Sequence, residues 1–219
     1  MANYHLEIQN VVNTALAELE AEHKAGKLTN APVANNHFLV HWVTKALKAQ
    51  RFHRCVGDDL TQWQKAGRSK GTESQLLPTF QRISAYYAHF FAEQEHTPIT
   101  DKQIEAFLDE MEQAGWEVST SEPLVNAGKV QIFTDGQNSL ALCSVQCEAC
   151  FDGERLVKPM NWFVRGHHVG FIEKAFAAGF MVHKQTDYKS NVKYHGEYLI
   201  FPANQGTQLA EIPISFRAN

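Results

Sequence analysis

The sequence lacks any long hydrophobic run. Nowhere do eighteen apolar residues follow one another, which excludes a membrane-spanning helix of ordinary length. The first nine residues carry Glu7, whereas a secretory signal would have basic residues followed by a continuous apolar stretch. We therefore expect a cytoplasmic protein with no membrane partner. Cysteine is also scarce, with four in 219 residues, and in a reducing compartment these are expected to be free thiols.

Familiar catalytic motifs are missing as well. The sequence has no GxGxxG, no phosphate loop ending in Lys-Ser or Lys-Thr, and no GxSxG. His37 and His41 lie four residues apart, but no glutamate follows His37, so the HExxH pattern of zinc proteases is absent too. With 44% hydrophobic residues the chain can bury a core without disulfides or metal. These absences favour a binding or regulatory protein over an enzyme.

What the sequence does have is a strong asymmetry of charge. The segment from Lys45 to Lys70 carries seven basic residues against Asp58 and Asp59, in a chain whose net charge is −4. The seven are Lys45, Lys48, Arg51, Arg54, Lys65, Arg68 and Lys70. We predict that they bind an anion, with nucleic acid as one candidate, since a helix, a turn at Gly57 and a second helix with Trp63 loosely resemble a helix-turn-helix. The alternative is pairing with the acidic residues between Glu93 and Glu122.

Hydrophobic periodicity predicts an α+β protein. The first region, residues 1–98, reads as helices at residues 6–23, from 32 onward, at 58–67 and at 78–91. The second region, residues 99–219, starts with a helix at 100–115 that has a Thr100/Gln103 capping box. A single continuous domain is the alternative to two regions. An alternating pattern then predicts an antiparallel sheet, with a further helix at 167–178. Its strands are expected at 129–134, 139–144, 156–164, 181–187, 192–195, 198–201 and 212–216.

Two details of this sheet are predicted from turn and repeat signals. Residues 135–138 indicate a hairpin turn, and Pro159 should confine its strand to an edge or a bulge. Residues 107–118 align with residues 171–182 at an offset of 64, each with a helix that ends at glycine followed by an aromatic residue. A duplication would give two helix-plus-hairpin units; chance resemblance is the alternative.

The chemically most pointed feature is a group of three cysteines, Cys143, Cys147 and Cys150. Two of them have the two-residue separation that suits one tetrahedral zinc, and the segment between them is expected to be a loop. His168 is the predicted fourth ligand, with His167, His183 and Cys55 as alternatives. A closed four-ligand site would be structural, whereas an open position would indicate a small cysteine- or zinc-dependent enzyme. The plain alternative is three reduced thiols in the core.

Four segments, residues 25–30, 44–54, 157–163 and 194–199, together resemble a bacterial family known only as a domain of unknown function. The likeness spans nearly the whole chain. It implies a bacterial cytoplasmic protein and brings no activity, ligand or catalytic residue. From the residues themselves we predict a non-catalytic binding or regulatory protein, zinc-stabilised through the cysteines, whose partner is a macromolecule, either protein or nucleic acid.

Overall fold

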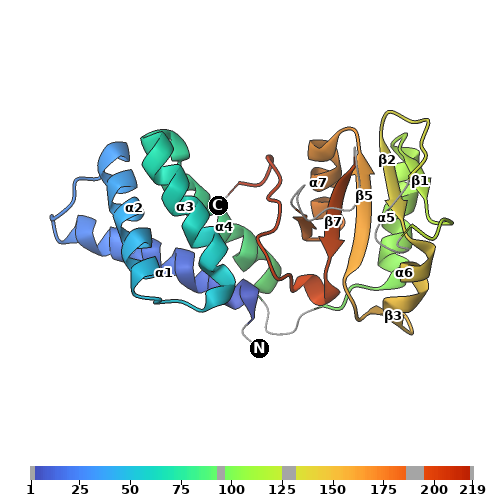
Figure 1. Ribbon diagram of the computed structural model, residues 1–219, viewed down its shortest axis with the longest axis horizontal. Helices are drawn as coiled ribbons and strands as arrows, with labels where there is room; N and C mark the ends of the chain where they lie inside the picture. Colours follow the sequence, from blue (N-terminus) through green and yellow to red (C-terminus); the bar gives the residue numbers. More distant parts are fainter. Residues whose placement is uncertain (1–2, 93–96, 125–131, 186–194, 218–219) are drawn as a thin grey trace. The chain divides into compact units, whose positions relative to one another are not determined.

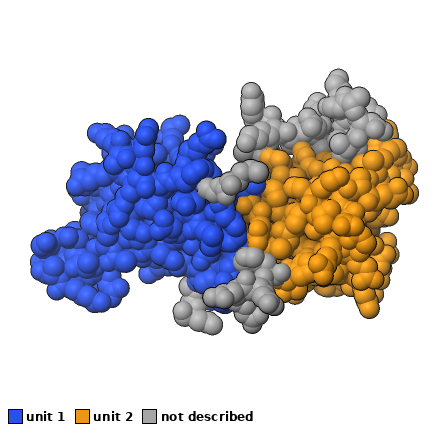
Figure 2. Space-filling model, turned by 90° about the horizontal axis from the view of Figure 1, so that it is seen from below, with its two compact units in different colours: residues 1–94, 207–209, 216–219 blue, residues 95–206, 210–215 orange. Residues whose placement is uncertain are grey.

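The computed structural model describes residues 3–92, 97–124, 132–185 and 195–217. The chain divides into two compact units, coloured separately in Figure 2. The first comprises residues 1–94, 207–209 and 216–219, and the second comprises residues 95–206 and 210–215. Residues 207–209 and 216–219 therefore belong to the first unit, whereas the predicted regions placed all residues after 98 in the second.

The first unit is built from four α-helices (Figure 1). These are α1 (Tyr4–Lys24), α2 (Pro32–Lys48), α3 (Gly57–Lys70) and α4 (Leu76–Phe91), with 3-10 turns η1 (Arg54–Val56) and η2 (Gly71–Ser74) before α3 and α4. Helix α1 packs on α4, and α2 packs on α3. The predicted helices are confirmed because each presents a recurring apolar face to one core, as do Ile8, Val12 and Ala15 on α1.

Helices α2 and α3 approach each other closely at Gly67. A β-carbon there would clash with Cγ2 of Val40, so glycine lets the two backbones pack together. Next to this contact, the Thr44 hydroxyl donates to the Val40 carbonyl at 2.8 Å and accepts from Gln64 at 3.0 Å. This fixed pairing sets which side chains of α2 and α3 share one surface.

The second unit contains a five-stranded mixed sheet in the order β1-β2-β5-β7-β6. Its strands are β1 (Glu117–Ser119), β2 (Ser139–Leu142), β5 (Met160–Arg165), β6 (Val182–Lys184) and β7 (Gly196–Ile200). A small hairpin consists of β3 (Phe151–Asp152) and β4 (Arg155–Leu156), and the helices are α5 (Asp101–Gln113), α6 (Ser144–Ala149) and α7 (His168–Ala177). A 3-10 turn, η3, covers Pro202–Asn204. The α+β class is thus confirmed.

The main core of this unit lies on one face of the sheet. Trp162 of β5 is fully buried and stacks on Phe107 of α5, with ring centroids 5.2 Å apart. Phe171 of α7 meets both rings edge-on. On the opposite face a smaller cluster contains Ala141, Cys143 and Phe163. The alternation of β2 and β5 residues between the two clusters is the period of two expected for a strand covered on both faces.

The predicted hairpin around residues 135–138 is wrong. Residues 132–134 form no strand, and residues 129–131 lie outside the described residues. Strand β2 is instead an interior strand, parallel to β1 and antiparallel to β5, so both of its edges are already paired. The turn contacts β1 through Glu117, whose Oε2 accepts from the Gly136 amide and the Thr134 hydroxyl at 2.6 and 2.7 Å.

Two other strand predictions also change. The run at 156–164 is divided at Pro159 into β4 and β5, and β5 is an interior strand rather than an edge because the proline precedes it. Residues 212–216 form no strand. The amide of Glu211 donates to the Val182 carbonyl at 2.8 Å, but Pro213 has no amide hydrogen to continue such pairing. The strand expected at 192–195 lies almost entirely outside the described residues.

The two segments of the predicted repeat have the same geometry at the helix ends and differ at the strands. Helices α5 and α7 are each followed, two residues after the last helical residue, by a glycine with positive φ, Gly115 at 82° and Gly179 at 86°. The amides of Trp116 and Phe180 close the same backbone bond, to Met111 and Ala175 at 3.0 and 2.8 Å. However, β1 is parallel to β2, whereas β6 is antiparallel to β7. Among the described elements, only α7 is therefore followed by an antiparallel pair of strands, as the predicted helix-plus-hairpin unit requires.

None of the helices in the described part of the chain is long and apolar enough to cross a membrane.

Candidate functional site

From His37 to its C-terminal end, helix α2 exposes only histidine and lysine side chains. Beyond Val33, the exposed residues of this helix are His37, His41, Lys45 and Lys48. They recur at intervals of four, four and three, and therefore form one stripe along the helix. From His37 to Lys48 the stripe extends roughly 16 Å along the helix axis. The helix contains no aspartate or glutamate.

Helix α3 extends this stripe sideways. Arg68 Nη2 lies 3.3 Å from Thr44 Oγ1, which places the guanidinium across the α2–α3 junction. His41 and Lys48 are the i−3 and i+4 neighbours of Thr44, so they flank the residue of α2 that Arg68 contacts. Lys65 is exposed one turn before Arg68. We call His37, His41, Lys45, Lys48, Lys65 and Arg68 the basic face.

Carboxylates are excluded from the sequence around the basic face. Between Glu22 and Glu73 only Asp58 and Asp59 are acidic, and Asp59 accepts a 2.8 Å hydrogen bond from the Tyr4 hydroxyl. The segments of the first unit hold eleven Lys and Arg against eight Asp and Glu, and those of the second hold nine against sixteen, which together give the net charge of −4. The positive charge of the protein is thus concentrated in its helical unit.

The structure brings together four of the seven predicted anion-binding residues. Lys45, Lys48, Lys65 and Arg68 lie on the basic face. Arg51 instead forms an ion pair with Glu18, and Arg54 lies in η1 beside a separate cavity of about 350 Å³. Lys70 is the last residue of α3. Among the residues that the structure describes, Lys45, Lys48, Arg54, Lys65 and Lys70 form no ion pair.

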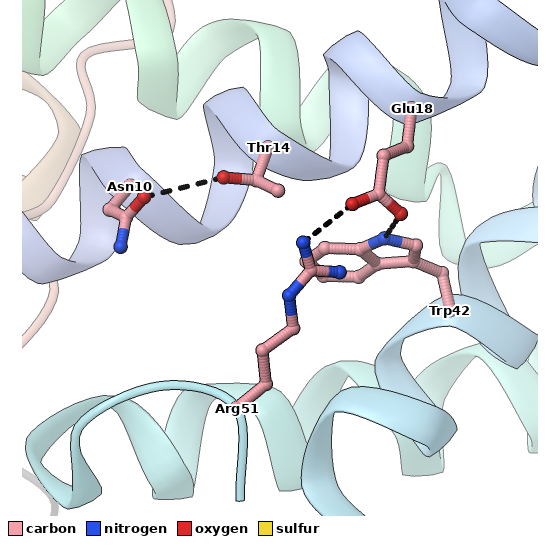
Figure 3. A network of polar contacts seen from close by, with 5 residues as sticks. All are labelled: Asn10, Thr14, Glu18, Trp42 and Arg51. Carbon is pink, nitrogen blue, oxygen red and sulfur yellow. Dashed lines mark hydrogen bonds and ion pairs between the residues drawn. The ribbon is translucent and has the colours of Figure 1, made fainter. Parts of the chain in front are cut away.

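Arg51 belongs to a polar network between α1 and α2, shown in Figure 3. Both carboxylate oxygens of Glu18 are engaged: Oε1 accepts from Arg51 at 2.6 Å and Oε2 accepts from the Trp42 indole at 2.6 Å. The Arg51 guanidinium lies 5.5 Å from the Trp42 ring centroid. Its hydrogen bond is the main reason that the pKa of Glu18 falls below the ordinary value, with the Trp42 bond helping. The network holds Trp42 in a fixed orientation.

Beside this network a cleft of about 450 Å³ opens between α1 and α2. Its wall includes two aromatic rings, Phe38 and Trp42, and its rim carries His41, Lys45 and Glu22. We call it the α1–α2 cleft. Because His41 and Lys45 belong to both features, the cleft is continuous with the basic face.

Sequence patterns could not reveal the cleft. Its α1 wall contains Glu18, which lies 24 residues before Trp42, and nothing in the local pattern pairs residues so far apart. The basic face had a stronger signal, because the absence of carboxylates from α2 is visible in the sequence alone. Its continuity onto α3 depends on the Thr44 contacts, which only the fold supplies.

The loose resemblance to a helix-turn-helix is wrong in its geometry. Residues 49–56 separate α2 from α3, whereas the motif has a turn of three or four residues. A recognition helix also reads bases with its N-terminal residues, but α3 carries Asp58 and Asp59 in its first turn. The cations of α3 lie towards its other end, so duplex readout by this helix is disfavoured.

The three predicted cysteine ligands are placed around α6 and do not converge. The segment expected to be a loop is this helix, with Cys143 at its N-cap, Cys147 inside it and Cys150 at its C-cap. Cys143 belongs to the small cluster on one face of the sheet, and Cys150 to the main core on the other. The Cys150 thiol lies 3.4 Å from the Pro159 carbonyl oxygen.

His168 lies elsewhere in the second unit. Its Nδ1 is 3.0 Å from the Tyr198 hydroxyl, beside Gly196, which pairs with Val164. Cys150 is near Pro159, at the other end of β5, and the strand rises roughly 13 Å between Met160 and Val164. Among the described residues no group of three or more His, Cys, Asp or Glu is arranged to hold a metal ion. Zinc binding therefore stays a prediction that these positions do not favour.

The described thiols also differ from activated nucleophiles. Burial is the largest cause that raises the pKa of Cys147, Cys150 and Cys55 above the ordinary thiol value. A reactive cysteine needs the opposite, a pKa lowered by positive surroundings. The cysteine-enzyme alternative gains no support from these three residues.

Comparison with known proteins adds the family. A family model described as "Protein of unknown function (DUF2913)" matches residues 3–213. The chain belongs to this family. The match includes all four segments on which the resemblance was based, so that expectation is confirmed. No curated protein and no solved structure matches the chain. The DUF2913 description assigns no activity, and the functional proposal therefore depends on the geometry above.

Proposed function

We propose that this DUF2913 protein binds nucleic acid through the basic face. The observation that carries the proposal is the exposed stripe of α2, which consists of two histidines and two lysines without a carboxylate, extended onto α3 by Lys65 and Arg68. Phosphates are contacted mainly by lysine, arginine and polar side chains. A stripe of histidine and lysine side chains over roughly 16 Å matches several steps of a nucleic-acid strand, which repeat every 3.4 Å in B-DNA.

A nucleic acid fits this surface better than an acidic protein. Lysine is depleted at protein–protein interfaces, where aromatic residues and arginine are enriched instead. The basic face has three lysines, and they are exposed. Phosphate binding needs no deep burial of the cations, because much of its free energy comes from the release of counterions. The alternative of internal charge pairing is weakened because Lys45, Lys48 and Lys65 contact no described carboxylate.

The test is binding of a fluorescently labelled strand of about 20 nucleotides, longer than ordinary single-strand sites. The double variant Lys45→Gln, Lys48→Gln is expected to bind at least roughly tenfold more weakly at low salt, because two phosphate contacts are lost. Fluorescence anisotropy measures the dissociation constant.

The matched control is Lys102→Gln, Lys158→Gln. Both lysines are exposed in the second unit, and this change removes the same two positive charges. It should leave the dissociation constant within about twofold, since neither lysine belongs to the basic face and exposed charges that contact no phosphate contribute little. Equal weakening by the two double variants would contradict the proposal, as would a wild-type protein that binds neither single-stranded nor duplex nucleic acid.

A further inference from the structure

We propose that the bound nucleic acid is single-stranded and that one of its bases enters the α1–α2 cleft. This inference rests on the proposed function and names the form of nucleic acid that the same surface selects. Single-strand binding sites combine cations that follow the phosphates with aromatic side chains that stack on the bases. The basic face and the cleft are these two parts, joined at His41 and Lys45.

The size and lining of the cleft suit one unpaired base. A volume of about 450 Å³ accommodates a planar ring system together with part of its sugar. Phe38 is partly exposed and supplies an aromatic surface at the cleft wall. Ala21, Ala46 and Ala49 also line the cleft, and their small side chains leave space for a ligand. A base inserted there would replace water against apolar carbon, which is favourable.

The cleft is also held open before any ligand arrives. Glu18 binds the Trp42 indole and the Arg51 guanidinium at 2.6 Å each, as Figure 3 shows. Arg51 in turn lies 5.5 Å from the centroids of both Trp42 and Phe52. These contacts keep the Trp42 part of the aromatic wall in place, so binding a base requires less ordering of side chains.

One of the two carboxylates that line the cleft gives it a hydrogen-bonding edge. Glu22 is partly buried at the cleft, and no hydrogen bond or ion pair of its side chain is present among the described residues. Glu18 cannot play this part because both of its oxygens are engaged. A carboxylate accepts from amino groups of bases, such as N4 of cytosine. Glu22 therefore favours a base that presents such a donor.

A duplex would leave the cleft empty. Its bases are stacked and paired, and an aromatic wall between two helices reaches a base only when that base is out of the stack. The first turn of α3 carries Asp58 and Asp59, which are repelled by phosphates if this helix enters a groove. The geometry thus selects single strands over duplexes of equal charge.

The experiment compares a cytosine-containing single strand with an abasic strand of the same length, which has the same phosphates and lacks the bases. We expect the wild-type protein to bind the complete strand roughly tenfold more tightly, the effect of one base stacked on an aromatic side chain. Phe38→Ala should bind the complete strand as weakly as the abasic one and leave abasic binding unchanged. Lys45→Gln, Lys48→Gln should weaken binding of both strands.

Two controls make the result specific. Phe38→Leu keeps apolar volume in the helix and removes the ring, so it should reproduce Phe38→Ala even if the smaller residue disturbs packing. Phe133→Ala removes a phenylalanine that is 89% exposed in the second unit and should change neither affinity. Equal affinity of wild-type protein for complete and abasic strands overturns the inference and leaves the proposed function standing. Absence of binding to both strands and to the duplex overturns the proposed function itself.

Discussion

Replacing Asp59 with asparagine is expected to stabilise the helical unit by about 2 kcal/mol near pH 7.5 and to leave its stability almost unchanged near pH 4. The side chain of Asp59 lies in the first turn of α3 and accepts a 2.8 Å hydrogen bond from the Tyr4 hydroxyl of α1. Asparagine can accept the same hydrogen bond through Oδ1 without a charge. The substitution therefore removes a partly buried charge and keeps the contact.

The sign follows from the pKa of Asp59, which burial raises to about 6, with the nearby Asp58 adding to the effect and the Tyr4 bond opposing it. An acid whose pKa is higher in the folded state than in the unfolded state stabilises the fold while it is protonated. That stabilisation is complete below the ordinary aspartate pKa and is lost as the pH rises through about 6. A shift of about two units corresponds to about 3 kcal/mol, which partial exposure of the side chain reduces to about 2 kcal/mol.

Urea unfolding followed by far-ultraviolet circular dichroism at three pH values measures the effect. The matched control is Asp58→Asn, because Asp58 is exposed in the same first turn and shares any interaction with the helix dipole. This control should change the free energy of unfolding by only a few tenths of a kcal/mol. A lower free energy of unfolding for Asp59→Asn than for the wild-type protein near pH 7.5 would show that the charged carboxylate stabilises the fold, which contradicts the prediction.

The largest loss of stability is expected from Phe107→Ala in the second unit. Phe107 is 1% exposed, stacks on Trp162 at 5.2 Å and meets Phe171 and Phe180 edge-on at 6.3 and 5.5 Å. Truncation removes buried apolar surface and leaves a cavity lined by these three rings. We expect a loss of about 3–5 kcal/mol in the free energy of unfolding.

Phe133→Ala is the matched control for this substitution. It makes the same chemical change at a side chain that is 89% exposed, and its expected effect is within about 0.5 kcal/mol. Thermal unfolding of both variants and the wild-type protein compares them directly. A Phe107→Ala variant as stable as Phe133→Ala would contradict the assignment of α5 to the core of the sheet.

The helices of this protein could be predicted because each has a local signal. Apolar side chains recur at helical spacing, Pro32 stands at the first position of α2, and the Thr100 hydroxyl caps α5 by accepting from the Gln103 amide at 3.2 Å. Even here tertiary structure decided one detail. The Gln103 side chain does not return to Thr100 but donates to the Ala178 carbonyl at the end of α7, at 2.9 Å.

Strand partners could not be predicted in the same way. An alternating pattern indicates a strand without indicating which strand lies beside it, so β2 was assigned to a hairpin although its neighbours are β1 and β5. The cysteines show the same limit. Their spacing suits a metal, but a short helix between Cys143 and Cys150 places these two in clusters on opposite faces of the sheet.

The candidate site was predictable in part. Composition alone identified the basic segment, and helical spacing placed Lys45 and Lys48 on one side of α2. Neither composition nor spacing could show that Arg51 forms an ion pair with Glu18, 33 residues earlier. Nor could they show that Arg68 contacts Thr44 of α2. Such contacts depend on the packing of helices that are distant in the sequence.

The salt dependence of single-strand binding tests the central claim most directly. If Lys45, Lys48, Lys65 and Arg68 each contact a phosphate, the logarithm of the association constant should fall with the logarithm of salt concentration with a slope of about −3. The slope of the Lys45→Gln, Lys48→Gln variant should be about half as steep, while that of Lys102→Gln, Lys158→Gln should equal the wild-type slope. A wild-type slope near zero, or the same slope in both double variants, would contradict nucleic-acid binding by the basic face.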